Sequence, residues 1–362
     1  MHFPDLFLPA VAAVVGTWLA LWLHLRFWER RLGVNVRYEL EERLSTPDGS
    51  RIELRRLPAP AQPDGLPPVL IVHGLGANHR NNDLSDDLSL ARHLSASGRD
   101  VWLLTLRSGV PMRSFLDAWR VRFRAMVHHD VPMAVSEVLA RTGASQLDYV
   151  GFSMGGMLLY ASLAHTVGVE HVRRVGIVGS PAIVRPPIGL PVPALLAKIP
   201  AWLFPTLRLR LAARLGAFAA EWFRTPAHHW VYNPHNVAAG VGRTALVNVI
   251  EDIPGPLNRD FTAWAAGPGG ALTLDGERVL DRLHDVTVPA IFFAGVADRL
   301  APPAAVRAAY DAWGLGANPD KSLVLLGSEH GSRADYGHGD LAVGRHAAED
   351  VFEPLRVFLA AG

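Results

Sequence analysis

The sequence contains no cysteine among its 362 residues. This absence excludes disulfide bonds, thiolate metal sites, iron–sulfur clusters and a cysteine nucleophile. The chain also lacks an excess of charge of either sign, because 35 basic side chains stand against 34 acidic ones. Near neutrality argues against a nucleic-acid-binding protein, which would carry a basic face. Only 19% of the residues are charged and 49% are hydrophobic, so the distribution of the apolar residues is informative.

One long uncharged run lies near the N-terminus, from Leu6 to Leu25. At about 1.5 Å per residue it is long enough to cross a hydrocarbon layer about 30 Å thick. Arg26 to Arg31 follows as an aromatic and basic cluster of the kind found at membrane interfaces. We therefore predict a single-pass membrane anchor within residues 1–32, with the bulk of the chain on the cytoplasmic side.

Two other interpretations of this run stay open. A cleaved signal peptide would have a basic start and a small-residue cleavage site, and the sequence shows neither before the arginines. The other alternative is an apolar helix that lies on the domain or in the plane of the membrane.

Beyond the anchor, short apolar runs alternate with stretches of helical periodicity. Wholly apolar runs of this length are typical of strands covered on both faces of a parallel sheet. The order strand, helix, strand predicts an α/β fold with a doubly wound, mostly parallel sheet, preceded by a β-hairpin. The expected strands are 36–44, 51–57, 69–72, 101–106, 147–150, 175–178, 290–294 and 323–326, and the expected helices include 86–97, 131–142 and 347–361.

The alternation stops between Ile183 and about Gly270, where no clear strand is visible and an apolar helical region is expected at 195–223. We predict that residues 183–270 form a helical cap inserted between two parts of the core, 36–182 and 271–362. Basic residues dominate its first half, where Glu221 is the only acid. Such a cap suits contact with an anionic lipid surface. Alternatively, its apolar face packs on the core and its arginines are solvated.

The segment from Gly151 to Gly155 reads Gly-Phe-Ser-Met-Gly and fits the pattern GxSxG. It lies between an expected strand and a helical run, which is the context that the pattern requires. A serine on such a sharp turn needs small residues two positions away on either side, because side chains there would collide with the strand and the helix. Ser153 is therefore the candidate nucleophile. The backbone N–H of Met154, at the start of the helix, is a candidate oxyanion donor.

The segment from His73 to Gly76 follows the expected strand 69–72, where this architecture draws its second oxyanion donor. We predict that the backbone N–H of Leu75 is this donor. The side chain of His73 is expected to order the loop.

A serine nucleophile needs a histidine base, and the base needs a carboxylate that fixes its tautomer. In this architecture the chain order is serine, acid, histidine. Asp298 follows the expected strand 290–294 and is the acid candidate, although it could instead cap the turn before the next helix. Of the histidines after the last strand, His346 is expected at the surface. Spacing alone leaves His330 and His338 nearly tied as the base.

The sequence resembles the α/β hydrolase superfamily, in particular the branch of acid lipases and related bacterial esterases. The likeness is carried by the stretch from Asp130 to Gly156 with its GxSxG segment, and it extends over about 36–182 and 280–361. In that branch the catalytic histidine lies in a segment like YGHxD. His338 and Asp340 match this segment, so the resemblance implies that His338 is the base and His330 the alternative. One departure is Phe152, which stands where the branch often has histidine.

No metal ion or organic cofactor is expected. The histidine pairs at 128–129 and 228–229 lack a third ligand at suitable spacing on a predicted helix, and we interpret them as structural. No phosphate-binding loop or dinucleotide fingerprint follows a strand.

These features predict a membrane-anchored serine hydrolase that cleaves a lipophilic carboxylic ester through an acyl-enzyme. One alternative is an acyltransferase or polyester synthase on the same fold, although polyester synthases that resemble this chain use cysteine at the elbow. A second alternative is a non-catalytic binding protein on a hydrolase scaffold.

Overall fold

The computed structural model describes residues 3–59, 61–112, 114–186, 193, 195–220, 222, 228–316 and 319–361. The predicted anchor and cap are therefore described in part. Glu221, named above as the single acid of the first half of the cap, lies outside the described residues.

Eight strands of the described chain form one twisted sheet in the order β1-β2-β4-β3-β5-β6-β9-β10. The strands from β4 to β10 in this order pair in parallel, while β2 pairs antiparallel with both β1 and β4. The mostly parallel α/β sheet predicted from the apolar runs is thus confirmed. The strands are β1 (Leu40–Ser45), β2 (Arg51–Arg56), β3 (Val69–Val72), β4 (Val101–Thr105), β5 (Leu147–Phe152), β6 (Val172–Val178), β9 (Ala290–Gly295) and β10 (Lys321–Leu326), and a separate short hairpin is formed by β7 (Thr273–Leu274) and β8 (Glu277–Arg278).

The inner strands are mostly apolar because both of their faces are buried, and β3 is apolar at every position. In β3, Val69 and Ile71 point into one hydrophobic core, while Leu70 and Val72 point into the other. Since side chains alternate along a strand, helices must cover both faces of the sheet.

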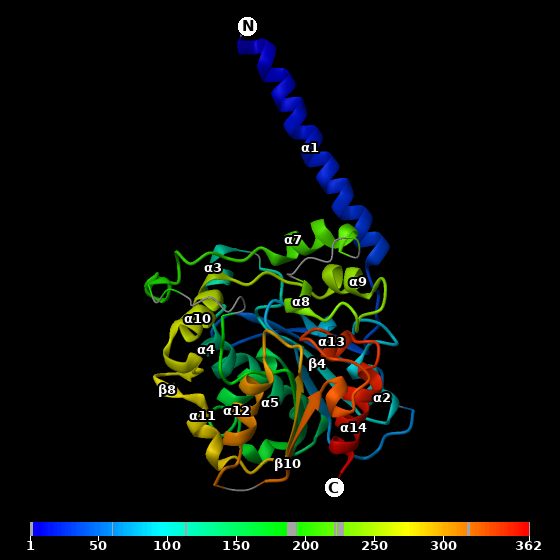
Figure 1. Cartoon of the computed structure of the whole chain (residues 1–362), viewed down its shortest axis with the longest axis vertical. Helices are drawn as coiled ribbons and strands as arrows, with labels where there is room; N and C mark the ends of the chain where they lie inside the picture. Colours follow the sequence, from blue (N-terminus) through cyan, green and yellow to red (C-terminus); the bar gives the residue numbers. More distant parts are fainter. Residues whose placement is uncertain are drawn as a thin grey trace.

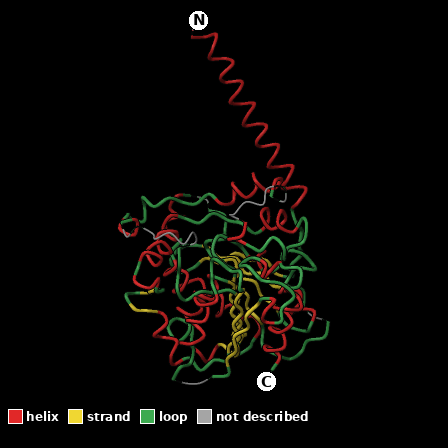
Figure 2. Tube along the Cα trace, viewed as in Figure 1, coloured by secondary structure: helices red, strands yellow, loops and turns green. Residues whose placement is uncertain are grey.

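Helices pack on both faces of the sheet, as Figure 2 shows. Side chains of α5 (Val131–Thr142), α6 (Met154–Ser162) and α12 (Pro303–Ala312) fill the core on one face. Those of α2 (Leu90–Ala96) and α14 (Glu353–Ala360) fill the core on the other. The remaining helices of the described core and cap are α3 (Phe115–Trp119), α4 (Phe123–Ala125), α7 (Leu209–Gly216), α8 (His228–Val231), α9 (Val241–Asn248), α10 (Gly255–Ala266), α11 (Val279–Arg282) and α13 (Asp340–Val343).

The N-terminal helix α1 (Phe3–Leu32) projects away from the domain (Figure 1). The stretch from Phe7 to Leu32 is long and apolar enough to cross a membrane, by length and composition only. The helix is attached to the domain at its C-terminal end, where Glu29 pairs with Arg214 and the ring of His24 packs on Phe218.

The segment 183–270 leaves the core and returns to it at one place. Val184 N–H donates to the carbonyl of Gly270 over 2.7 Å, and Ile183 forms a bridge with Ala271. The apolar helical region expected at 195–223 is not one continuous helix: its described residues form short 3₁₀ turns at Leu196–Lys198 and Ala217–Ala219 and the helix α7. Prolines at 200 and 205 explain the breaks, because proline removes a helical hydrogen bond and clashes with the preceding turn.

Two helix boundaries also differ from the prediction. The helix expected at 86–97 begins only at Leu90, because the side chain of Ser89 accepts a hydrogen bond from Arg92 N–H and caps it. The closing helix begins as a π-helical turn, Ala348–Phe352, before it continues as α14.

Candidate active site

Ser153 lies on the sharp turn between β5 and α6. Its backbone is strained, with φ 52° and ψ −117°. The turn is possible because the residues two positions before and after Ser153 are glycines. A Cβ at Gly151 would lie 2.4 Å from the nitrogen of Gly156, and one at Gly155 would lie 2.3 Å from the carbonyl oxygen of Val72. The two glycines of GxSxG therefore meet the steric need expected from the sequence, and Ser153 is left half-buried at the carboxyl edge of the sheet.

The structure brings Ser153, His338 and Asp298 into one hydrogen-bonded chain. The Nε2 atom of His338 is 2.9 Å from Ser153 Oγ, and its Nδ1 atom is 2.7 Å from Asp298 Oδ2. Asp298 Oδ1 accepts hydrogen bonds from the N–H groups of Leu300 and Ala301, both at 2.8 Å. The carboxylate thus caps its own turn and holds the imidazole at the same time.

Buried charge changes the proton affinity of His338. Burial alone would lower the pKa of this imidazole, but the charge of Asp298 and the hydrogen bond to it outweigh burial and raise the pKa above 6.5. Protonated His338 is therefore stabilised beside Asp298, which is the electrostatic arrangement that a general base next to a serine needs.

A second carboxylate fixes the loop that carries His338. Asp340 is fully buried and accepts hydrogen bonds from Gly337 N–H, from Asn233 N–H and from the side-chain amide of Asn236, over 2.8–3.0 Å. The two asparagines belong to the segment 183–270, so this part of the chain positions the histidine loop. The sequence signals Asp340 through the YGHxD likeness, but nothing in it marks Asn233 or Asn236, which lie about a hundred residues away.

The loop from His73 to Gly76 lies against the nucleophile. A Cβ at Gly74 would lie 3.0 Å from Ser153 Cβ, so the backbone beside Leu75 is close to the serine. His73 is buried, with Nδ1 against the Gly74 carbonyl at 2.8 Å and Nε2 accepting from Leu106 N–H at 3.0 Å. Burial lowers the pKa of His73 to about 4, so the ring is neutral and holds the loop, as expected for an ordering role.

Two sequence features near the site have simple structural outcomes. The ring of Phe152, which stands where related proteins often have histidine, contacts the ring of His338 edge-on with centroids 5.3 Å apart. His330, the alternative base, lies in an exposed turn, Ser328–His330, and it is His338 that bonds Ser153.

Elsewhere in the described chain, an open pocket of about 840 Å³ lies between α10 and the β7–β8 hairpin, and none of the three residues of the hydrogen-bonded chain lines it. One group of side chains in the described ranges, His128, His165 and Asp275, could hold a metal ion. The spacing of the His128–His129 pair did not indicate this group, because its other members are distant in the sequence.

Comparison with known proteins agrees with this fold. Residues 67–332 match the model of the alpha/beta hydrolase fold family. The chain belongs to the alpha/beta hydrolase fold family. Human gastric triacylglycerol lipase is 33% identical to this hydrolase over 128 residues, which cover 32% of each chain. The hydrolase thus spans about a third of the length of the curated relatives that it matches.

Solved structures support the fold of this alpha/beta hydrolase over most of its length. An esterase from Exiguobacterium antarcticum covers 89% of this chain and 100% of its own, with 15% identity and a TM-score of 0.55. A membrane phospholipase A described as a bacterial virulence factor covers 98% of this chain and 96% of its own, with 17% identity and a TM-score of 0.51. At these identities the likeness concerns the fold alone.

Proposed function

We propose that this hydrolase is a membrane-anchored serine esterase or lipase that cleaves lipophilic carboxylic esters. The observation that carries the proposal is the hydrogen-bonded chain from Ser153 through His338 to Asp298 on a strained elbow. The likeness to gastric triacylglycerol lipase supports an ester of a lipid as the substrate class. We assign residues 1–32 to an anchor, 36–182 and 271–362 to the catalytic core, and 183–270 to a cap.

In this mechanism Ser153 Oγ attacks the ester carbonyl while His338 Nε2 takes the hydroxyl proton. The tetrahedral intermediate collapses, the carbon–oxygen bond to the alcohol breaks, and His338 returns its proton to the leaving alkoxide. Water, deprotonated by His338, then attacks the acyl-enzyme. The second tetrahedral intermediate collapses, its bond to Ser153 Oγ breaks, His338 returns the proton to Ser153, and the acid is released. Asp298 keeps the Nδ1 proton of His338 directed toward itself and stabilises the imidazolium.

The negative charge on the carbonyl oxygen would be held by the backbone N–H groups of Leu75 and Met154. Two features support this assignment. The His73–Gly76 loop lies against Ser153, and Met154 is the first residue of α6, where helix N–H groups point outward.

A fluorophosphonate probe tests the reaction. We expect the detergent-solubilised protein to be labelled on Ser153, and the Ser153→Ala and His338→Ala variants to lose labelling. The His330→Ala variant is the matched control and should label like the wild type. Labelling that survives in His338→Ala but not in His330→Ala would move the base to His330. A folded wild-type protein that does not react would contradict the mechanism and favour a non-catalytic binding protein.

The same preparation separates hydrolysis from acyl transfer. With an ester substrate and added alcohol, a hydrolase should release mainly free acid, whereas an acyltransferase should form the new ester. The ratio of acid to new ester decides between these two functions.

We also propose that α1 crosses the membrane and places the domain on the cytoplasmic side. The support is its length, its exposed apolar side chains such as Trp18 and Trp22, and the arginines in its last turn. An alkaline wash of isolated membranes should leave the protein in the membrane pellet, and release into the supernatant would contradict a spanning helix.

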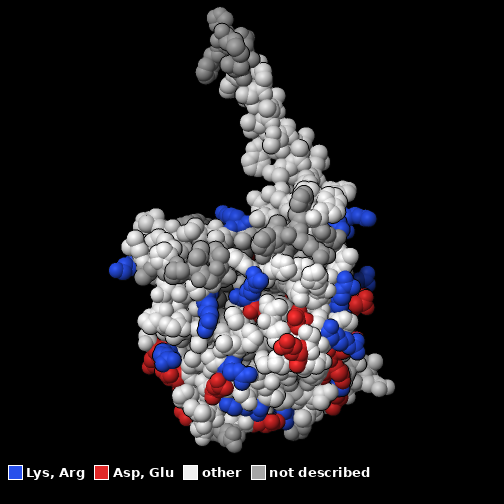
Figure 3. Space-filling model, viewed as in Figure 1, with Lys and Arg blue, Asp and Glu red and all other residues white. Residues whose placement is uncertain are grey.

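The cap face nearest to α1 is proposed to rest on the same membrane surface. In Figure 1 the helix α7 and the chain before it lie along the upper face from which α1 emerges. Large apolar side chains, among them Trp202 and Leu203, are more than half exposed there, and Arg208 is exposed beside them. In Figure 3 the described residues along the upper margin of the domain are mostly white, with Lys or Arg side chains at several points. Apolar anchors with a basic rim are typical of surfaces that bind anionic lipid.

Vesicle binding tests this contact. A Trp202→Ser/Leu203→Ser variant should hydrolyse a dissolved short-chain ester normally, but it should hydrolyse esters in anionic vesicles more slowly. Leu315→Ser is the control, because Leu315 is similarly exposed but lies in the connection between α12 and β10. Equal activity of all three proteins on vesicles would contradict the proposed contact.

A further inference from the structure

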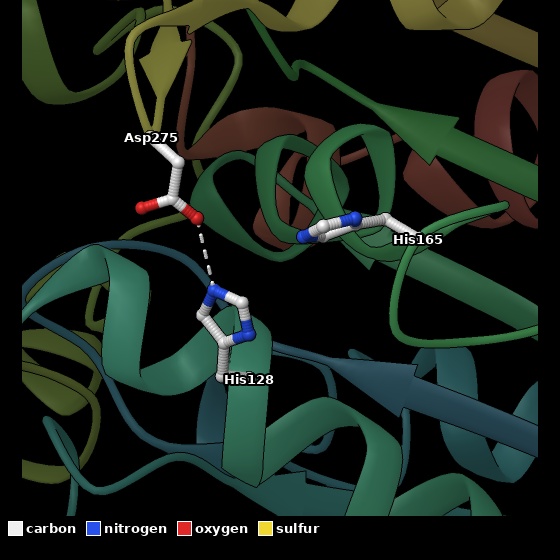
Figure 4. Close-up of side chains that lie close together, drawn as sticks. All are labelled: His128, His165 and Asp275. Atoms are coloured by element: carbon white, nitrogen blue, oxygen red, sulfur yellow. Dashed lines mark hydrogen bonds and ion pairs between the residues drawn. The ribbon is translucent and has the colours of Figure 1, made fainter.

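Three side chains from distant segments lie close together, as Figure 4 shows. His128 comes from the π-helical turn η2 (Met126–Asp130), His165 from the turn after α6, and Asp275 from the turn of the β7–β8 hairpin. One ligand atom of each lies within 4.8 Å of the other two. His128 Nε2 is 3.2 Å from Asp275 Oδ2, and a ring nitrogen of His165 points into the same space.

We propose that these three side chains bind one Zn²⁺ ion. Two imidazole nitrogens and one carboxylate oxygen form a donor set that suits zinc, whereas Mg²⁺ and Ca²⁺ prefer oxygen donors. Zinc binds such ligands at about 2.0–2.2 Å, so the three donors must move together by roughly 1 Å. All three side chains are at least partly exposed, so small rotations can achieve this. The remaining coordination position is open to water.

The surroundings hold the ligands in place. Arg124 Nε donates to Asp275 Oδ1, which leaves Oδ2 directed at His128. This is the way in which outer-shell partners commonly orient a ligating carboxylate. The hydroxyl of Thr166 donates to the carbonyl of Val127 over 2.8 Å, so the turn carrying His165 is tied to the segment carrying His128.

The backbone geometry is unusual in all three segments. The non-glycine residues with positive φ in the described chain are Ser153, Ala164 and Asp275. Ser153 is the proposed nucleophile, Ala164 precedes His165, and Asp275 belongs to the cluster. His128 lies on a π-helical turn, a feature often found at functional sites. Such conformations cost free energy and persist where the surrounding structure demands them.

The charged side chains around the cluster balance one another. Two guanidinium groups lie near the cluster, and both are paired with carboxylates: Arg124 with Asp275, and Arg282 with Glu277 at 2.6 Å. Because Asp275 and Arg124 also line the pocket beside α10, a bound ion would fix the hairpin that borders this pocket. The proposed role is structural and does not depend on the serine mechanism.

Zinc titration of the untagged, full-length protein in detergent, after chelator treatment, tests the site by calorimetry and metal analysis. We expect one Zn²⁺ per chain and a rise in melting temperature on zinc addition. His165→Ala and Asp275→Asn should each weaken binding at least about tenfold, because even outer-shell partners are worth 10- to 100-fold in affinity. Neither variant should show the zinc-dependent rise in melting temperature.

His93→Ala is the matched control. His93 lies 3.1 Å from Glu353, which is also held by an arginine, Arg356, but this trio has no second histidine. This variant should bind zinc like the wild type, and a cobalt-loaded wild type should show the visible absorption of a tetrahedral site that His165→Ala lacks. The proposal is overturned if the wild type binds no zinc, or if His165→Ala and Asp275→Asn bind it as tightly as the wild type.

Discussion

At the residue scale, the two oxygens of Asp298 have different partners. Oδ1 accepts from the N–H groups of Leu300 and Ala301, and Oδ2 faces His338 Nδ1. The backbone donors therefore fix the orientation of the carboxylate, and an amide in the same place would be held the same way round. The side-chain nitrogen of an asparagine would then face His338.

This arrangement makes Asp298→Asn informative. The amide N–H would donate to His338 Nδ1, and the ring proton would move to Nε2, where it blocks proton transfer from Ser153. We expect kcat to fall by about 10⁴-fold, the loss that follows when the same residue is changed in other serine triads. The Asp298 charge raises the pKa of His338 in the wild type, so the acidic limb of kcat/KM should move to lower pH in the variant. A pH–rate profile with an unmoved acidic limb would contradict this account.

The lowered pKa of His73 predicts a pH dependence of stability. Its pKa is about 4 in the folded state and 6.5 when unperturbed, so the unfolded chain binds a proton first as the pH falls. The contribution of neutral His73 to the free energy of unfolding is fully present above pH 6.5. Acidification toward pH 4 lowers the free energy of unfolding by about 3 kcal/mol through this group. His73→Gln keeps an acceptor for Leu106 N–H without this titration. Denaturant midpoints between pH 7.5 and 4.5 should therefore fall less steeply for the variant than for the wild type.

The sequence predicts some residues of the site and misses others for a physical reason. Ser153 carries a local steric signature, and Asp298 follows a strand in the required order, so each is visible within a few residues. Choosing His338 over His330 needed the family likeness, because both follow the last strand. Asn236 and the pair His165 and Asp275 have no local signature, since only the folded chain brings them to their partners.

At the scale of elements, the apolar runs mark the inner strands because strands buried on both faces are mostly apolar. The strand β6 begins before its predicted start at residue 175, because Arg173 and Arg174 interrupt its apolar run. The segment 195–223 is harder to predict, because its apolar composition is typical of a helix while its prolines interrupt helical hydrogen bonds.

The loop with His338 depends on the cap segment through Asp340. This carboxylate accepts from three donors, and an asparagine would place its own N–H groups against at least one of them. We expect Asp340→Asn to lower the free energy of unfolding by about 1–3 kcal/mol, the cost of an unsatisfied buried polar group. It should also slow probe labelling of Ser153. Asp335→Asn, which changes an exposed carboxylate of the same loop, is the control and should leave labelling unchanged.

At the scale of the whole molecule, α1 consists of a part docked on the domain and a part that extends away from it. The last turns dock on the domain through His24 and Glu29, and Asn248 bonds the carbonyl of Leu32 at 2.8 Å and the N–H of Val34 at 3.0 Å. The part before His24 extends away from the domain (Figure 1). Because the docked part sets the direction of the helix, the same cap face is held toward the proposed membrane.

Removing residues 2–22 should separate the contributions of these two parts. The docked turns remain, so we expect probe labelling and hydrolysis of a dissolved short-chain ester within about twofold of the wild type, because the distal helix contributes nothing to the core. Activity on vesicle-embedded esters should fall much further, since the cap alone must then find the surface. A matched Glu29→Gln variant keeps the distal helix and weakens the ion pairs of Glu29 with Arg214 and Arg26. If the truncated protein matched the wild type on vesicles, the cap would suffice for binding and the distal helix would have another role.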